Sequence, residues 1–208
     1  MIKSHTRPIT YLITPGDATP DNFEEKQADI LNAVRAASAN GISLIQIREK
    51  QISTRSLFSL VSAAADITRE SGTRLLVNDR VDVAISAGAD GVHLTTRSLP
   101  VGVIRQTFGN ELLVAVSTHT LQEALDAREG GADLVVFGPL FASPDKAEPV
   151  GLERLSEVCA SLSDVPVVGL GGVNGENYHS VLEAGGAGFA AIRFLNDPDV
   201  IRSIAHRL

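Results

Sequence analysis

Tryptophan is absent from this 208-residue sequence, and aromatic residues make up only 4% of it. A hydrophobic core must therefore be built from aliphatic side chains, which suits strands that are covered on both faces. Hydrophobic residues account for 44% and charged residues for 21%, an ordinary globular composition. We expect one domain over residues 1–208, with residues 1–8 as a loose N-terminal extension.

Cysteine is nearly absent. Cys159 is the only one in the sequence, so no disulfide can form within the chain, which is typical of a reducing compartment. Cys159 lies on the apolar side of a helical pattern, where we expect it to be packed rather than reactive. The N-terminal residues lack the apolar core of a signal peptide, and no apolar run is long enough to span a bilayer. These features predict a cytoplasmic protein.

Positive charge is outweighed by negative charge. The sequence has 18 Lys and Arg against 25 Asp and Glu, a formal net charge of −7. No stripe of basic residues interleaved with aromatic residues is present, so neither a nucleic-acid partner nor a membrane partner is expected. A local basic pocket for phosphate is compatible with this balance, because net charge does not describe a pocket.

Short β-branched runs alternate with amphipathic stretches along the whole chain. Most of the runs are continuously apolar, as is usual for parallel strands that are buried on both faces. The predicted strands are Thr10–Thr14, Ser43–Ile47, Arg74–Val77, Gly91–Leu94, Leu112–Val116, Leu134–Phe137, Pro166–Leu170 and Gly188–Ile192.

Side chains that can cap a helix precede several of the amphipathic stretches. Ser53 is expected to cap one helix, and Thr120 with Glu123 forms a T-x-x-E capping box before another. The other expected helix starts are Asp21 with Glu24, Asn174, and Asn196 followed by Pro198.

Glycine recurs just before the even-numbered strands, where it can end a helix in the left-handed conformation. The segments are Asn40-Gly41, Gly88-Ala89-Asp90, Gly131-Ala132-Asp133 and Gly186-Ala187-Gly188. Eight regular β-α units predict an α/β fold, a single (β/α)8 TIM barrel. An open doubly wound sheet is the alternative, but no G-x-G-x-x-G motif follows the first strand.

The functional site of such a barrel lies at the C-terminal ends of its strands, so polar residues there are candidates. Gln46, Arg48 and Lys50 alternate after the second strand, which places them on one side of an extended chain. The two cations offer a site for an anion of pyrophosphate size. The alternative is an ordinary ion pair of Arg48 or Lys50 with Glu49 or with a neighbouring carboxylate.

The third strand is followed by Asn78 and Asp79. A carboxylate beside a phosphate site is a natural Mg²⁺ ligand, because Mg²⁺ takes few protein oxygens together with substrate phosphate. The alternative is that Asn78 or Asp79 caps the following helix.

Two histidines lie near the ends of the fourth and fifth strands. His93 stands within an apolar strand, where a structural role is expected. His119 follows Ser117 and lies at the rim, where acid–base chemistry is geometrically feasible, and Thr120 is expected to act as the helix cap.

The segment Gly138 to Gly151 is long for a βα loop, which usually has roughly 2–6 residues. Its Gly, Pro, Ser and Lys residues predict a lid that becomes ordered on a ligand, with a plain surface loop as the alternative.

Glycines follow the seventh strand. Backbone N–H groups of Gly171 and Gly172 can approach a phosphate, and a helix that follows them would favour the negative charge. Arg193, after the eighth strand, adds a cation where barrels often bind phosphate. Zinc-ligand clusters, a nucleophile elbow and a Walker loop are all absent from the sequence. The residues by themselves therefore predict a phosphate-binding barrel with a Mg²⁺ site.

Six motifs occur in the order and spacing of the thiamine phosphate synthases, and the sequence resembles that family from Tyr11 to about Leu195. They are Gln46-Ile-Arg-Glu-Lys50, Asn78-Asp-Arg-Val-Asp82, Ala89-Asp-Gly-Val-His-Leu94, Ser117-Thr-His-Thr120, Gly138-Pro-Leu-Phe141 and Gly171-Gly-Val173. The resemblance implies an enzyme that joins an aminopyrimidine methyl diphosphate to a thiazole phosphate and releases pyrophosphate.

The resemblance also implies roles for individual residues. Gln46 and Asn78 would hold the pyrimidine, Asp79 would bind Mg²⁺, and Gly171 would bind the thiazole phosphate through its backbone. The residues implied to hold the diphosphate are Arg48, Lys50, Ser117 and Lys146.

Three positions depart from the family pattern. Ser98 stands where a second Mg²⁺ carboxylate is usual. In the long loop one hydroxyl is kept as Ser143, but Asp145 places an anion where thiazole phosphate is expected. Arg193 replaces a serine after the last strand and would pair with Asp145 or bind the phosphate directly.

The departures keep two other functions open. The related thiazole tautomerases share the barrel and isomerise a thiazole carboxylate phosphate by proton transfer, for which His119 is the natural candidate. A non-catalytic barrel that binds thiamine precursors is the third hypothesis. The synthase is preferred because the sequence keeps a diphosphate half-site that would be surplus in a tautomerase. Its residues are Gln46, Arg48, Lys50, Asn78, Asp79 and Lys146.

Overall fold

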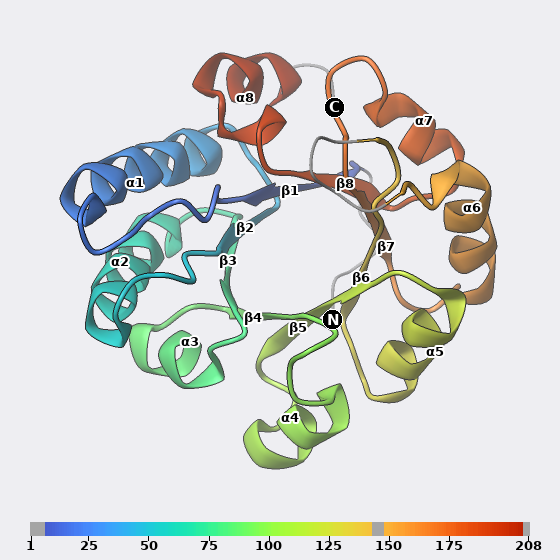
Figure 1. Cartoon of the computed structure of the whole chain (residues 1–208), viewed down its shortest axis with the longest axis horizontal. Coiled ribbons are helices and arrows are strands. Elements are labelled where there is room, and N and C mark those ends of the chain that lie inside the picture. Colours follow the sequence, from blue (N-terminus) through green and yellow to red (C-terminus); the bar gives the residue numbers. More distant parts are fainter. Residues whose placement is uncertain (1–6, 143–147, 206–208) are drawn as a thin grey trace. The chain divides into compact units, whose positions relative to one another are not determined.

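The computed structural model describes residues 7–142 and 148–205. Its eight strands form a closed barrel in sequence order, β1 to β8, and the strands alternate with helices along the chain (Figure 1). The predicted (β/α)8 barrel is thereby confirmed. The predicted strand for β4 and that for β6 match the structure at both ends, and the others differ by one or two residues at an end, which is the usual scatter of strand boundaries.

The elements have the following bounds. The strands are β1 Ile9–Ile13, β2 Leu44–Ile47, β3 Arg74–Asn78, β4 Gly91–Leu94, β5 Leu113–Thr118, β6 Leu134–Phe137, β7 Val167–Leu170 and β8 Gly188–Ala191. The helices are α1 Phe23–Ala39, α2 Thr54–Thr68, α3 Val81–Ala87, α4 Val101–Phe108, α5 Leu121–Glu129, α6 Gly151–Ser161, α7 Tyr178–Glu183 and α8 Pro198–Ala205, with a short 3-10 helix, η1, at Phe194–Asn196.

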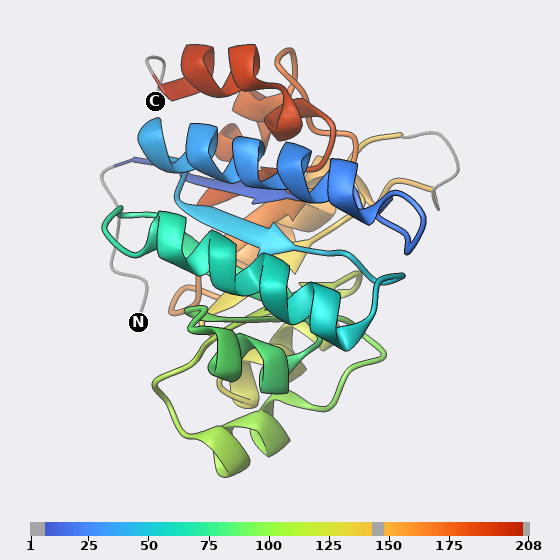
Figure 2. The same cartoon turned by 90° about the vertical axis from the view of Figure 1, so that its left-hand side faces the viewer.

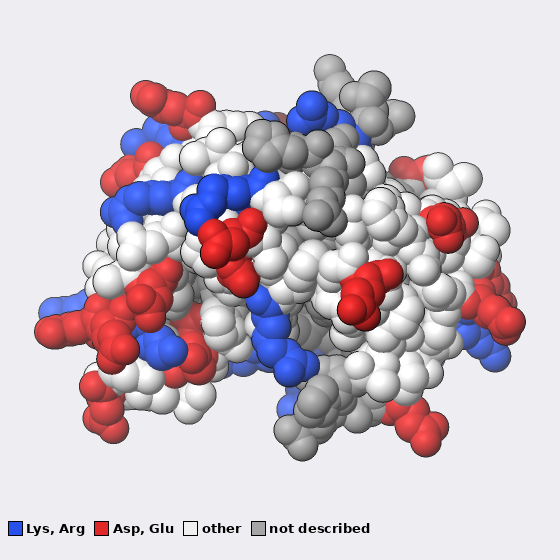
Figure 3. All heavy atoms as spheres, turned by 90° about the horizontal axis from the view of Figure 1, so that it is seen from above, with Lys and Arg blue, Asp and Glu red and all other residues white. Residues whose placement is uncertain are grey.

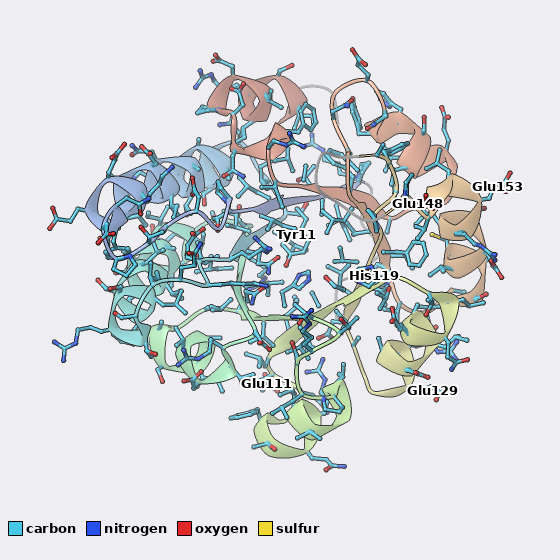
Figure 4. The ribbon with its side chains drawn as sticks, viewed as in Figure 1. Tyr11, Glu111, His119, Glu129, Glu148 and Glu153 are labelled. Atoms are coloured by element: carbon cyan, nitrogen blue, oxygen red, sulfur yellow. The ribbon has the colours of Figure 1, made fainter. Side chains whose placement is uncertain are left out.

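The chain divides into two compact units, and one of them contains residues 10–92 and 192–205. In this unit β1, β2 and β3 pair in parallel, with Tyr11 opposite Leu44 and Leu44 opposite Arg74. Helices α1 and α2 lie side by side along these strands (Figure 2). Tyr11 on β1 is labelled in Figure 4 and is fully buried, and burial raises the pKa of its hydroxyl well above the usual value.

The other unit contains residues 93–191 together with the residues that lead into β1. Here β5 to β8 pair in parallel, and Val135 lies opposite Val167. The core is mainly aliphatic, as the composition predicts, but Phe137, Tyr178 and Phe189 are also buried, and the rings of Tyr178 and Phe189 lie 5.1 Å apart between centroids. Helices α5 and α6 bury small and branched side chains, among them Ala124 and Val158.

Two of the predicted helix caps are confirmed. Ser53 accepts a hydrogen bond from the backbone N–H of Ser56 at 3.1 Å and starts α2. Thr120 accepts from the N–H of Glu123, whose carboxylate in turn accepts from the N–H of Thr120, so α5 begins with a complete capping box. A cap of this kind contributes about 1 kcal/mol to stability.

The expected start of α1 at Asp21 with Glu24 is wrong. Asn22 precedes the helix, and its side-chain oxygen accepts from the N–H of Thr19 at 2.7 Å rather than from the first helical turn. A turn before the helix has therefore taken up the side chain that would otherwise cap it.

The caps predicted at Asn174 and Asn196 are also wrong. The N–H of Asn174 donates to the side chain of Asn177, and α7 begins only at Tyr178. The side-chain amide of Asn196 donates to the carbonyl of Ile13, while α8 does begin at the predicted proline. A local turn at Asn174 and a distant backbone carbonyl at Asn196 therefore take the place of the expected helix caps.

The glycines before the even strands behave as predicted at three of four places. Gly41, Gly88 and Gly131 have φ values of 71°, 74° and 92°. Before β8 the left-handed residue is Gly185, with φ 94°, rather than Gly186. The shift by one residue fits the early end of the short helix α7, whose last residue is Glu183.

Cys159 on α6 is half-buried rather than fully packed, and burial raises the pKa of its thiol to about 11. In the described ranges no helix has both the length and the apolar character needed to cross a membrane. Acidic and basic side chains lie interspersed on the face shown in Figure 3, which agrees with the absence of a basic stripe from the sequence.

Candidate functional site

Gln46 and Asn78, the two residues implied to hold a pyrimidine, are brought into contact. Both side chains are buried near the C-terminal ends of the paired strands β2 and β3. The amide nitrogen of Gln46 donates to the side-chain oxygen of Asn78 at 3.0 Å. The alternative that Asn78 caps α3 is not supported, because the cap position of that helix is Arg80 and no side chain caps it. Two amides fixed against each other can present the rest of their donors and acceptors to a heterocyclic base.

Arg48 does not form the ion pair with Glu49 that the sequence left open as an alternative. No ion pair between these neighbours is present in the described part of the chain, and the Arg48 side chain lies against the loop between β1 and α1. A guanidinium nitrogen of Arg48 is 3.5 Å from the carbonyl oxygen of Pro15. Arg48 is half-buried and Lys50 is exposed.

The carboxylate of Glu49 is buried and serves the same β1–α1 loop. It accepts from the hydroxyl of Thr14 at 2.6 Å and from the backbone N–H groups of Gly16 and Ala18, each at 3.0 Å. From the sequence, Glu49 is expected only as a partner for its basic neighbours. In the sequence Glu49 is a carboxylate between two cations at a strand end. This pattern does not show in which direction the Glu49 side chain turns.

Asp79 is exposed and has a φ of 61°, the only positive φ of a described residue other than glycine. A side chain in this conformation is uncommon, and such backbone strain clusters at functional sites. The next cation along the chain is engaged elsewhere, because Arg80 forms two hydrogen bonds to the carboxylate of Asp82, at 2.6 and 2.8 Å. This pairing lowers the pKa of Asp82 and raises that of Arg80.

Arg193 lies two residues after the end of β8 and is exposed just before η1. The carbonyl of the preceding Ile192 accepts from the side chain of Asn196, which also holds the carbonyl of Ile13 at the end of β1. The backbone that carries Arg193 is therefore tied to β1.

Ser117 and His93 are hydrogen-bonded to each other. The Nε2 atom of His93 lies 2.7 Å from the hydroxyl oxygen of Ser117, and His93 is buried. His93 is thus a structural histidine, as predicted, but its partner is one of the residues implied to hold the diphosphate.

His119 lies at the C-terminal end of β5 and is exposed (Figure 4). Its Nδ1 atom is 2.5 Å from the carbonyl oxygen of Gly138. Because a carbonyl can only accept, Nδ1 donates, which leaves Nε2 of the neutral imidazole without a proton. An exposed, oriented Nε2 can accept a proton from a bound molecule.

The glycines after β7 pack tightly under the start of the long loop. The N–H groups of Leu140 and Phe141 donate to the carbonyls of Leu170 and Gly171 at 2.8 and 2.9 Å. Gly171 has a φ of 100°, and a Cβ atom there would lie 2.5 Å from Cα of Pro139. Gly172 has a φ of 66°, and its Cβ would lie 2.8 Å from the carbonyl oxygen of Ala142. The expected helix does not follow the glycines directly, because Asn174–Asn177 form turns before α7.

Ser98 uses its hydroxyl locally. The N–H of Thr95 donates to it at 2.7 Å, and the hydroxyl of Thr95 is 3.1 Å away. Ser98 therefore closes a turn in place of the carboxylate that is usual there. Ser143, Asp145 and Lys146 lie outside the described residues, so their expected roles in the long loop stay predictions.

A metal site made only of protein ligands is not present in the part of the chain that the structure describes, where no three His, Cys, Asp or Glu side chains are grouped. Mg²⁺ needs no such group, because it keeps several waters and takes one or two carboxylates plus substrate phosphate. The exposed carboxylate of Asp79, next to the buried Asn78, fits a site of that kind.

Comparison with known proteins places these motifs in one family. The family model described as thiamine monophosphate synthase matches residues 10–195. A thiamine-phosphate synthase from Caldanaerobacter subterraneus subsp. tengcongensis is 39% identical over 186 residues, which cover 88% of this chain and 86% of that protein. One from Chloroflexus aurantiacus is 40% identical over 178 residues, 84% of this chain and 82% of its own length.

A solved structure of thiamine phosphate pyrophosphorylase from Pyrococcus furiosus has a TM-score of 0.80 and 31% sequence identity, and 96% of each chain is covered. The family model spans most of the chain, and both relatives exceed 30% identity over more than four fifths of it. The chain therefore belongs to the thiamine monophosphate synthase family.

Proposed function

We propose that this protein joins an aminopyrimidine methyl diphosphate to a thiazole phosphate, forming thiamine phosphate and releasing pyrophosphate. The observation that carries the proposal is the buried contact of Gln46 with Asn78, close in the chain to Arg48, whose neighbour Glu49 accepts its hydrogen bonds from the β1–α1 loop. These residues would hold a heterocycle and its diphosphate side by side. The names and the extent of the matching relatives support the same reaction.

In the proposed reaction the bond between the pyrimidine methylene carbon and the diphosphate oxygen breaks first. The bonding electron pair leaves with the pyrophosphate, and the methylene carbon becomes a cation conjugated with the aminopyrimidine. The thiazole ring nitrogen then donates its lone pair to that carbon. The protein needs no nucleophile of its own, so catalysis would rest on charge stabilisation and positioning.

The roles of the side chains follow from this reaction. Gln46 and Asn78 would orient the pyrimidine, and Arg48 and Lys50 would stabilise the charge that gathers on the departing pyrophosphate. The resemblance to the family implies a phosphate-binding role for Ser117 as well, whose hydroxyl oxygen lies 2.7 Å from Nε2 of His93.

Asp79 would hold Mg²⁺, which when bound supplies further positive charge for the diphosphate. Ser98 offers no second carboxylate, so we propose that this chain holds the ion with one protein carboxylate, substrate oxygens and water.

The thiazole phosphate would bind at the glycines after β7. Gly171 and Gly172 have positive φ values, and a Cβ atom at either would meet residues 139–142, so the backbone is fixed where the resemblance implies phosphate binding. The resemblance to the family implies phosphate-binding roles for Ser143 and Lys146 as well, and the charge of Arg193 suits a phosphate group.

We also propose that the protein works in the cytoplasm. A chain with one cysteine gains nothing from an oxidising compartment, and its half-buried thiol is held protonated.

Thiazole tautomerase activity is the second candidate, because of the hydrogen bond of His119 to Gly138. This bond leaves Nε2 of His119 as the proton acceptor that an isomerisation of thiazole carboxylate phosphate requires. The local use of the Ser98 hydroxyl favours the same reading, since a tautomerase needs no second metal carboxylate.

The two reactions are separated by supplying each set of substrates to the purified full chain. The proposal predicts thiamine phosphate and an equal amount of pyrophosphate when both phosphorylated substrates and Mg²⁺ are present. Omission of either substrate should abolish both products. Turnover of thiazole carboxylate phosphate without any thiamine phosphate synthesis would replace the synthase with the tautomerase.

A further inference from the structure

Glu49 stands in the chain between Arg48 and Lys50, two cations that would bind the diphosphate, yet it forms no ion pair with Arg48 within the described residues. Its carboxylate receives one hydroxyl and two backbone N–H groups, all from the loop between β1 and α1. Hydrogen bonds to an ionised acceptor are about twice as strong as neutral ones, so this carboxylate is a firm anchor for the loop. The exposed fraction of Glu49 is only 3%, which removes competition from water.

Thr14 connects the anchored loop to Arg48. The hydroxyl of Thr14 donates to Glu49 at 2.6 Å and accepts from the backbone N–H of Arg48 at 2.8 Å. The Thr14 hydroxyl therefore binds both Arg48 and Glu49, which are adjacent in the chain, and it fixes the backbone at Arg48.

The anchored loop also forms the surface on which the Arg48 side chain rests. A Cβ atom at Gly16 would lie 2.6 Å from a guanidinium nitrogen of Arg48, and the carbonyl of Pro15 accepts from the same nitrogen at 3.5 Å. Gly16 has a φ of 81°, a conformation that suits glycine. The absence of a side chain at Gly16 thus leaves space for the Arg48 guanidinium against the loop.

We propose that Glu49 is a positioning residue for diphosphate binding, which holds the loop from Thr14 to Ala18 so that Arg48 is preset for a pyrophosphate group. The proposal rests on the proposed function, because Arg48 acts on a diphosphate only there. Glu49 itself touches neither substrate nor product. It fixes the loop against which the Arg48 side chain rests, and its carboxylate is occupied by hydrogen bonds from that loop.

The test compares Glu49→Gln with Glu70→Gln, a matched loss of one carboxylate at an exposed position of the same unit. An amide retains one acceptor oxygen but presents an NH₂ group to a loop N–H, so the anchor is lost with little change of volume. We expect Glu49→Gln to raise KM for the pyrimidine diphosphate about tenfold, which corresponds to about 1.4 kcal/mol. KM for the thiazole phosphate should stay within twofold, and Glu70→Gln should match the wild type.

Binding of inorganic pyrophosphate, followed by calorimetry, supplies a readout that does not depend on turnover. Glu49→Gln should weaken it about tenfold. A purely structural role would lower the melting temperature and the active fraction while both KM values and the pyrophosphate affinity stayed unchanged, and that result would overturn the proposal.

Thr14→Ser and Thr14→Val keep the test decisive if Glu49→Gln does not fold. Serine retains the hydroxyl and should preserve pyrophosphate affinity, whereas valine removes it and should weaken binding in the same way as the amide. Equal affinity of the two variants would overturn the positioning role. A wild-type protein that makes no thiamine phosphate and binds no pyrophosphate would instead contradict the proposed function itself.

Discussion

Replacement of Gly171 by alanine tests the close packing after β7 most sharply. The φ of 100° at this position is one that side chains rarely adopt, and holding a residue there costs roughly 1–3 kcal/mol. The added Cβ atom would lie 2.5 Å from Cα of Pro139 and 3.1 Å from the nitrogen of Leu140. These are backbone atoms that cannot rotate away, so overpacking adds about 1–3 kcal/mol.

The two contributions amount to about 4 kcal/mol, a large share of the total stability of a domain of this size, which is typically about 5–15 kcal/mol. Each kcal/mol lowers the melting temperature by roughly 2–4 °C at this chain length, so Gly171→Ala should melt about 8–16 °C below the wild type. Thermal unfolding followed by circular dichroism measures this directly.

Gly102→Ala is the matched control. Gly102 lies inside α4, its φ is not in the left-handed range, and a Cβ atom there would meet nothing within 4 Å. The same substitution should therefore stabilise the protein by roughly 0.5–1 kcal/mol. A melting temperature of Gly171→Ala within 2 °C of the wild type would refute the reasoning, because the backbone of Pro139 could not then lie where the structure places it.

Three further predictions concern the functional residues and the thiol. Asp79→Asn should lower synthase turnover at saturating Mg²⁺ by at least about 100-fold, because a neutral amide is a poor Mg²⁺ ligand; unchanged Mg²⁺ dependence of the rate would remove Asp79 from the metal site. His119→Ala should abolish any turnover of thiazole carboxylate phosphate and spare thiamine phosphate synthesis more, since only the former needs its Nε2 as a base. Equal rates for His119→Ala and wild type in both assays would make this histidine structural. Cys159 should be alkylated by iodoacetamide at pH 8 far more slowly in the native than in the urea-unfolded protein, because a pKa of about 11 leaves about one thiolate in a thousand. Its native rate should rise with pH up to about 11, and a rate at pH 8 equal to that of the unfolded chain would contradict the raised pKa.

The regular part of the fold could be predicted because it depends on local pattern. Gly91–Leu94 and Leu134–Phe137 were predicted with the bounds that the structure has, since each is a short apolar run between glycine- or aspartate-containing turns. The capping box at Thr120 was predicted for the same reason, because its partner lies three residues away.

Helix starts that depend on competition between hydrogen bonds could not be predicted. The side chain of Asn196 could cap a helix in sequence terms, but the carbonyl of Ile13, 183 positions earlier, receives its amide instead. Only the folded chain brings that carbonyl within reach.

In the candidate site, too, some features follow from position in the sequence and others only from the folded chain. The contact of Gln46 with Asn78 could be inferred from their places at the ends of neighbouring strands, and the structure forms it. The direction in which Glu49 turns could not be inferred, because two of its three partners are backbone N–H groups that leave no trace in the sequence.

The most direct test of the proposed function is the formation of thiamine phosphate by the purified protein from the pyrimidine diphosphate and the thiazole phosphate, with and without Mg²⁺. The product is identified by mass spectrometry, and pyrophosphate is quantified in the same samples. We predict Mg²⁺-dependent formation of both products in equal amounts, despite Ser98, Asp145 and Arg193. Folded protein that forms neither product at saturating substrates and Mg²⁺ would contradict the proposed synthase function.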